Sequence, residues 1–159
     1  MFEKIFDKLG SSYNNEENYL RDGKIYDAYY LLKSRKEKEA QFLSGILLII
    51  MNKRKKGIDL MLEYYEGGKK IVEEDIINEL IGTAFYQEEN YLEASRYYIK
   101  SLEINPNNTY SKYNLINVAL VKKDYRHAYK LLQELIKSEP NNNEILEKLK
   151  FVEEKINKI

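Results

Sequence analysis

The sequence predicts an all-α, right-handed solenoid of about four helix-turn-helix repeats, with accessory helices at both ends. Two observations support this prediction. The chain of 159 residues is rich in Glu, Lys, Leu, Ile and Tyr and has only two prolines and seven glycines, a composition that favours helices over a turn-dense β fold. The chain also repeats itself with a shift of 34 residues: Tyr91, Ala94 and Pro106 return as Tyr125, Ala128 and Pro140.

The same spacing continues upstream in a weaker form. Ile58, Met61 and Tyr65 keep the spacing of Tyr91, Ala94 and Tyr98, as do Ile25, Ala28 and Leu32, which gives units at intervals of 33, 33 and 34 residues. A fixed period in this range is typical of stacked repeats. We therefore expect one domain, divided into an amino-terminal helix (1–10), a divergent repeat (11–40), three further repeats (41–74, 75–108 and 109–142) and a capping helix (143–159).

The third unit predicts two helices. Its first helix has one apolar stripe, formed by Ile77, Leu80, Ile81, Ala84 and Phe85. A polar turn at 88–90 precedes a second helix over 91–104, which Pro106 ends. Small residues such as Gly82, Ala94 and Ala128 are expected where two helix backbones cross closely.

On these residues the third and fourth units resemble tetratricopeptide (TPR) repeats, whose pattern is W-x2-L-G-x2-Y, then A-x3-F, then P. The third unit supplies Ile81-Gly82-x2-Phe85, Ala94-x3-Tyr98 and Pro106. The fourth supplies Leu115, Ala128-x3-Leu132 and Pro140. Asn78 and Lys112 stand where the family often has Trp, and Ile116 replaces the glycine. The resemblance covers most of residues 11–142 and implies the helical stack.

The most apolar stretch, FLSGILLIIM at 42–51, is expected to be the buried first helix of the second repeat. At 1.5 Å per residue it covers roughly 15 Å, about half of a bilayer core. The basic run Lys53–Lys56 then falls in the turn before Gly57, where cations favour the carboxyl end of the preceding helix. A nuclear-import or phosphate-binding patch is the functional alternative.

Both ends of the chain predict accessory helices. Residues 143–159 carry one apolar stripe, formed by Ile145, Leu149, Val152, Ile156 and Ile159, which is expected to close the last repeat. Near the amino end, Phe2, Ile5, Phe6 and Leu9 form another stripe, ended by Gly10. This helix either folds back on the first repeat or serves in dimerisation or partner docking.

Composition and motifs argue against an enzyme and against catalytic, cofactor or metal sites. Cysteine is absent, which excludes thiol catalysis and thiolate metal sites. The 26 basic residues balance 26 acidic ones, so neither nucleic acid nor a membrane is an expected partner. His127 is expected on the surface, and Glu73, Glu74 and Asp75 are acids of the type favoured in a first helical turn. Gly67-Gly68-Lys69 lacks phosphate-loop spacing. No secretory signal is evident, which suggests a cytoplasmic protein.

The TPR resemblance implies a concave groove, lined by the first helices, that takes a peptide or helix of a partner protein. The predicted apolar and aromatic wall consists of Phe42, Ile49, Lys53, Ile76, Thr83, Tyr86, Tyr110, Tyr113, Asn117 and Leu120. The chain's own terminal helices are the alternative occupants of this wall. The lysine, asparagine and arginine set of chaperone-binding family members is incomplete here, since Glu79 and Tyr113 stand at the lysine positions. We expect a non-catalytic adaptor, either a monomer or a homodimer. The alternative is a small chaperone that shields an apolar segment of one client.

Overall fold

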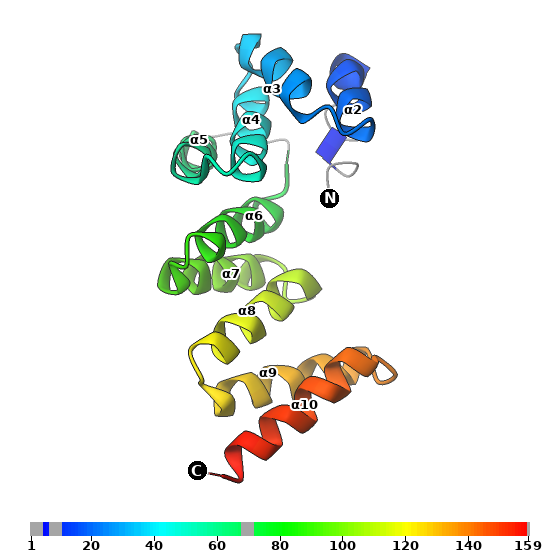
Figure 1. The fold of residues 1–159 in the computed structure, drawn as a ribbon, viewed down its shortest axis with the longest axis vertical. Helices are drawn as coiled ribbons and strands as arrows, with labels where there is room; N and C mark the ends of the chain where they lie inside the picture. Colours follow the sequence, from blue (N-terminus) through cyan, green and yellow to red (C-terminus); the bar gives the residue numbers. More distant parts are fainter. Residues whose placement is uncertain (1–4, 7–10, 68–71, 159) are drawn as a thin grey trace.

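The computed structural model describes residues 5–6, 11–67 and 72–158, and their regular structure is helical throughout. Figure 1 shows an elongated stack of helices, with the first described helices of the chain at one end and the last at the other. The predicted all-α stack is confirmed. Phe2, Leu9, Gly10, Gly68, Lys69 and Ile159 lie outside the described residues. The helices are η1 (Ser11–Tyr13), α2 (Asn14–Arg21), α3 (Ile25–Ser34), α4 (Lys38–Ile50), α5 (Arg54–Glu66), α6 (Glu74–Gln87), α7 (Tyr91–Ile104), α8 (Thr109–Val121), α9 (Tyr125–Ser138) and α10 (Asn143–Ile156).

One turn geometry joins the helices of each pair. The turns after α2, α4, α6 and α8 each contain one residue with a positive φ, at Gly23, Asn52, Glu89 and Lys123. Five residues after each of them lies a buried small residue: Ala28, Gly57, Ala94 and Ala128. The units therefore repeat at intervals of 29, 37 and 34 residues, and not at the expected 33, 33 and 34.

The first helix of the second pair, α4, is buried over Phe42–Ile49, as expected for an internal helix. Two glycines allow it to approach α5. A Cβ on Gly57 would lie 2.6 Å from the carbonyl oxygen of Gly45, and a Cβ on Gly45 would lie 2.8 Å from that of Gly57. Within the described part of the chain, no helix is long and apolar enough to cross a membrane.

The basic run after α4 lies elsewhere than predicted. Lys53 is the residue before α5, and Arg54, Lys55 and Lys56 form the first turn of that helix. Cations there oppose the helix dipole and do not complement the end of α4. Arg54 forms an ion pair with Glu88 at 3.6 Å. Gly57 is likewise part of α5 and not of the turn, because the turn geometry is supplied by Asn52, whose φ is 62°.

Side-chain caps define the starts of the last four helices. Asn90, Asn108, Asp124 and Asn142 each accept a backbone N–H of the first turn of α7, α8, α9 and α10, respectively. Such caps stabilise a helix by about 1 kcal/mol each. At the end of the stack, Ile145 and Val152 of α10 are fully buried with Leu132 and Leu135 of α9, so α10 covers the apolar side of the last pair.

Candidate functional site

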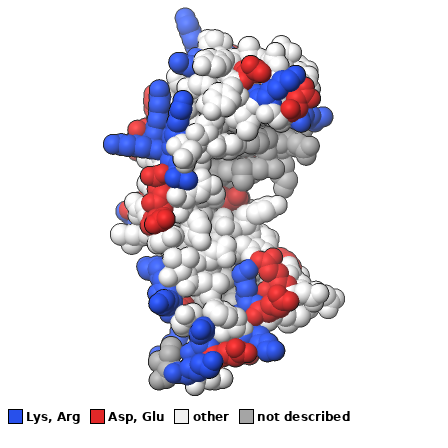
Figure 2. Space-filling view, in the orientation of Figure 1, with Lys and Arg blue, Asp and Glu red and all other residues white. Residues whose placement is uncertain are grey.

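A pocket of about 290 Å³ lies where α6 meets the start of α8. Each of these helices is the first of its pair. They contact each other directly although α7 separates them in the sequence, so they form the inner face of the stack. Figure 2 shows the molecule indented on the right-hand side at mid-height. The residues that line the pocket are Ile5, Asp75, Ile76, Glu79, Asn105, Asn107, Asn108, Thr109 and Tyr110.

Two carboxylates from consecutive turns of α6 form one wall of this pocket. Asp75 is 7% exposed and Glu79 is 6% exposed. The side-chain amide of Asn105 donates to Oδ2 of Asp75 at 2.8 Å. The amide of Asn108 lies 3.4 Å from the same oxygen and 3.3 Å from Oε2 of Glu79. One neutral amide group therefore lies within hydrogen-bonding reach of both acids.

The position of Asn108 follows from its role as a helix cap. Its Oδ1 accepts the backbone N–H of Ser111 at 3.0 Å, which begins α8. Its amide also donates to the Ser101 hydroxyl at 3.1 Å, and the Ser111 hydroxyl donates to that of Ser101 at 2.8 Å. These buried groups tie α7 to α8, and they orient the amide of Asn108 toward the carboxylates on α6.

The next repeat has a related junction with different chemistry. Tyr113 and Asn142 have the same separation, 29 residues, as Glu79 and Asn108. The amide of Asn142 donates to Oη of Tyr113 at 2.8 Å and to Oε2 of Glu139 at 2.7 Å. Burial raises the pKa of the Tyr113 phenol, and the nearby Glu139 carboxylate raises it further. A neutral phenol here replaces one of the two acids.

The rim and the rest of the wall come from α6, from the start of α8 and from the amino-terminal residue Ile5. Tyr110, in the first turn of α8, is 68% exposed, whereas Ile5, near the amino end, is only 1% exposed. Ile5 thus reaches the third and fourth helix pairs. Phe6 contacts the first repeat, since its ring lies 6.4 Å from that of Tyr13. The amino-terminal helix was expected to fold back on the first repeat or to serve in docking; its described residues contact the first repeat and also the third and fourth helix pairs.

The predicted wall is only partly brought together. Ile76 and Tyr110 line the pocket. Five further residues lie half-buried on the same two helices: Thr83, Tyr86, Tyr113, Asn117 and Leu120. Of these, Tyr86 packs its ring against Tyr91 of α7 at 5.4 Å.

Phe42 and Ile49 differ from the prediction, since they are 0% and 9% exposed and belong to the core. The ring of Phe42 lies 4.7 Å from that of Tyr64 on α5, and Phe42 shares a buried cluster with Ile5 and Phe6. The apolar inner face of the second repeat is therefore filled by the chain itself. Lys53 is exposed in the turn between α4 and α5, and it is not among the residues that line the pocket.

The sequence prediction missed the polar half of the pocket. Asp75 was interpreted as a first-turn acid, and Asn105 and Asn108 were not assigned to the wall. The available signal was the spacing of Asp75 and Glu79, because residues four apart lie on the same face of a helix. Among the described residues, the pocket included, no group of three or more His, Asp or Glu side chains is suited to hold a metal ion. His127 lies exposed in the first turn of α9.

Stacked pairs of helices with a pocket on their inner face are typical of helical-repeat proteins. Within that class, the chain has the TPR fold. MamA (AMB-1) superposes with a TM-score of 0.77 at 16% identity, covering 96% of this chain and 85% of that one. A TPR protein from Parabacteroides merdae gives 0.74 at 16%, covering 92% of this chain and 58% of that one. YrrB, described as a TPR protein with an unusual peptide-binding site, gives 0.71 at 13%, covering 92% and 77%. No protein-family model and no curated protein sequence matches the chain.

Proposed function

We propose that this protein is a non-catalytic interaction module that binds a segment of a partner protein along the inner face of α6 and α8. The observation that carries the proposal is the pocket between these helices, which has an exposed tyrosine at its rim. The TPR fold supports it, since one protein of this fold, YrrB, is described as having a peptide-binding site.

Tyr110 is the side chain on which binding should depend most. It offers a large, mostly exposed ring with a polar tip, and such residues often dominate interfaces. Because its side chain contributes little to the core, its removal should affect binding and leave the fold intact. Truncation of such an anchor costs about 1 to 4 kcal/mol of binding free energy.

The test uses a photo-crosslinking amino acid at position 110 and, as a control, at position 26. Tyr26 lies on α3 and is similarly exposed, at 62%. We expect position 110 to crosslink to a defined segment of a partner, identified by mass spectrometry, and position 26 to give no such product. Tyr110→Ala should weaken capture of that same partner, whereas Tyr26→Ala should not. Both variants should melt like the parent protein.

Crosslinks at position 26 alone, or full capture by Tyr110→Ala, would move the binding surface away from α6 and α8 and overturn the proposal. The chaperone alternative predicts crosslinks to an apolar segment of a single client. An adaptor predicts a segment whose sequence recurs in more than one protein. The same mass-spectrometric data therefore separate the two roles.

A further inference from the structure

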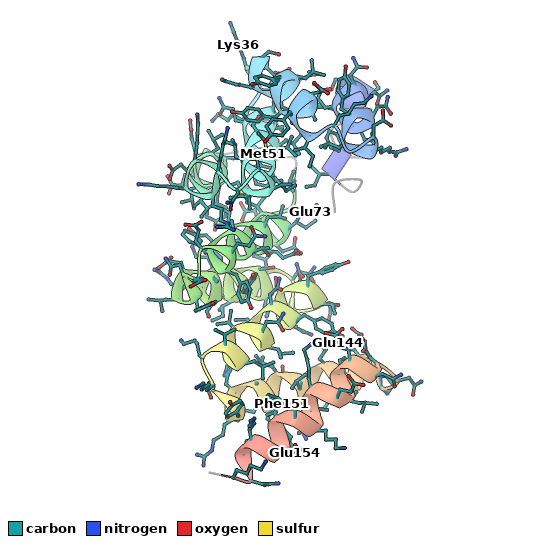
Figure 3. The ribbon with its side chains drawn as sticks, viewed as in Figure 1. Lys36, Met51, Glu73, Glu144, Phe151 and Glu154 are labelled. Carbon is teal, nitrogen blue, oxygen red and sulfur yellow. The ribbon has the colours of Figure 1, made fainter. Side chains whose placement is uncertain are left out.

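We propose that a groove between α9 and α10 binds an acidic segment of a partner protein, at a site separate from the pocket beside α6. This α9–α10 groove is a cavity of about 520 Å³. It lies at one end of the stack, where Figure 3 shows α10 with Phe151 and Glu154. Its described lining comes from α9 and from the carboxyl end of α10: Arg126, Tyr129, Lys130, Glu153, Ile156 and Asn157.

The α9–α10 groove is open because no described helix covers it. Asn108 and Asn142 cap α8 and α10 and are 34 residues apart, so α10 is placed like the first helix of a further pair. At the preceding junction, Leu131 of α9 packs on a buried cluster shared by α7 and α8, which includes Ala94 and Val118. Within the described chain, no helix follows α10 to pack in that way on α9 and α10. Their junction is therefore accessible to a partner.

Positive charge predominates at this end of the molecule. Arg126 and Lys130 are exposed in the lining, and Lys122 and Lys123 are exposed just before α9. In Figure 2, basic side chains lie at the lower left, where α8 joins α9 and where α10 ends. The lining contains one acid, Glu153. Within the described chain, neither Arg126 nor Lys130 takes part in an ion pair, so both cations are available to an anion.

In the preceding repeat, the equivalent positive charge is balanced. Arg96 lies 34 residues before Lys130, and its Nη1 is 2.8 Å from Oε1 of Glu93, in the first turn of α7. His127 stands 34 residues after Glu93, and the first turn of α9 has no acidic residue. Cations near the amino end of a helix are opposed by the helix dipole. A bound carboxylate would supply the negative charge that α7 carries at this place and α9 lacks.

The lining indicates a carboxylate next to an apolar side chain. Arg126 and Lys130 are four residues apart and so lie on the same face of α9, where one carboxylate can contact both. Tyr129 and Ile156, both half-buried, supply apolar surface in the same groove. The carboxylate of Glu153 would repel the closely spaced phosphates of a nucleic acid. Together these features fit a peptide segment with an aspartate or glutamate beside an apolar residue.

Random peptides displayed on phage supply the probe. They are selected on the full-length protein after removal of those that bind the double variant Arg126→Gln/Lys130→Gln, so that the retained peptides need the α9–α10 groove. We expect these peptides to share an aspartate or glutamate beside an apolar residue. In synthetic versions, replacing that acid by its amide should weaken binding at least about tenfold, measured by fluorescence anisotropy. The affinity of the acidic peptide should also fall as sodium chloride is raised.

Single variants separate attraction from repulsion in the groove. Lys130→Gln should weaken binding of the acidic peptide, whereas Glu153→Gln, which removes the acid of the lining, should strengthen it. A variant that only disturbed the packing of α10 would weaken binding in both cases. The matched controls are Arg96→Gln, the equivalent of Lys130 on α7, and Glu154→Gln, an exposed acid outside the lining. Both should change the affinity much less. Circular dichroism and melting curves establish that each variant is folded.

The proposal is wrong if no peptide survives the selection, if the amide versions bind as tightly as the acidic ones, or if folded Lys130→Gln binds like the parent. Association of the parent protein with itself at low salt, detected by light scattering and abolished in Lys130→Gln, would identify a second copy as the occupant and would equally overturn it. If the double variant does not fold, Lys130→Gln replaces it in the selection, and the amide and salt measurements need only the parent chain. Crosslinking at position 110 does not depend on these residues, so the interaction proposed along α6 and α8 is tested separately.

Discussion

At the scale of single residues, one buried ion pair fixes the divergent first repeat. Glu16 is 2% exposed, and its Oε1 accepts from Nε of Arg35 at 2.6 Å. Arg35 also donates to the backbone carbonyl of Ser12, and its guanidinium lies over the ring of Tyr13, 4.3 Å from the centroid. The Glu16 carboxylate raises the pKa of Arg35. A cation that joins η1, α2 and the end of α3 compensates for the small apolar content of α2.

Arg35→Met should therefore destabilise the protein by about 2 to 4 kcal/mol, because the buried Glu16 carboxylate loses its cation while the aliphatic volume is kept. The measurement is urea unfolding followed by circular dichroism. The double variant Glu16→Gln/Arg35→Met should recover much of the loss, since no unpaired charge remains. Equal losses in the single and double variants would show that the packing of Arg35 on Tyr13, and not the charge, stabilises this repeat.

At the scale of helices, the turn inside each pair and the close crossing of its two helices are separated by a fixed number of residues. Each left-handed turn residue precedes by five positions the small residue at which the second helix crosses the first. The crossings at Ala94 and Ala128 could be predicted from the sequence, because in both repeats the alanine lies the same number of residues before the proline. The register of the second repeat could not. Its crossing residue is a glycine, which carries no apolar signal, and the segment that joins α5 to α6 changes the interval to 37 residues.

Gly57→Ala tests this register. A methyl group there would lie 2.6 Å from the carbonyl oxygen of Gly45 and 2.7 Å from Cδ1 of Ile49. The helices would have to separate, at a cost of about 1 to 3 kcal/mol, which should exceed the gain of about 1 kcal/mol in helix propensity. We expect a lower melting temperature. Gly67→Ala, just after α5, is the control and should cost less, because a methyl group there would lie 3.0 Å from the flexible end of Lys38 and 3.1 Å from the carbonyl oxygen of Glu63. A Gly57→Ala protein more stable than its parent would contradict the close α4–α5 crossing.

At the scale of the whole molecule, the sequence predicted the stack and the helices that line its inner face, because apolar periodicity and proline spacing are local signals. It left open whether the chain's own terminal residues cover that face. The burial of Phe42 with the distant residues Ile5 and Phe6, and the junction of Asp75 with Asn105 and Asn108, arise only when separate repeats meet. The predicted wall was mainly apolar and aromatic, whereas the pocket combines apolar surface with the buried acids Asp75 and Glu79.

The last helix of the described stack, α10, packs on the helix pair before it. Ile145 and Val152 of α10 are 0% exposed, packed with Leu132 and Leu135 of α9. Val152→Asp should detach α10 by placing a charge in that contact, and deletion of 143–159 should have a similar effect. The exposed apolar face of α9 should then lower the melting temperature and promote association, which light scattering would detect. Leu146→Ser, at a position of α10 that is 45% exposed, should keep the molar mass and the melting temperature of the parent protein. If the Val152→Asp protein keeps the parent's melting temperature and molar mass, α10 does not close the stack, and the last pair is stable by itself.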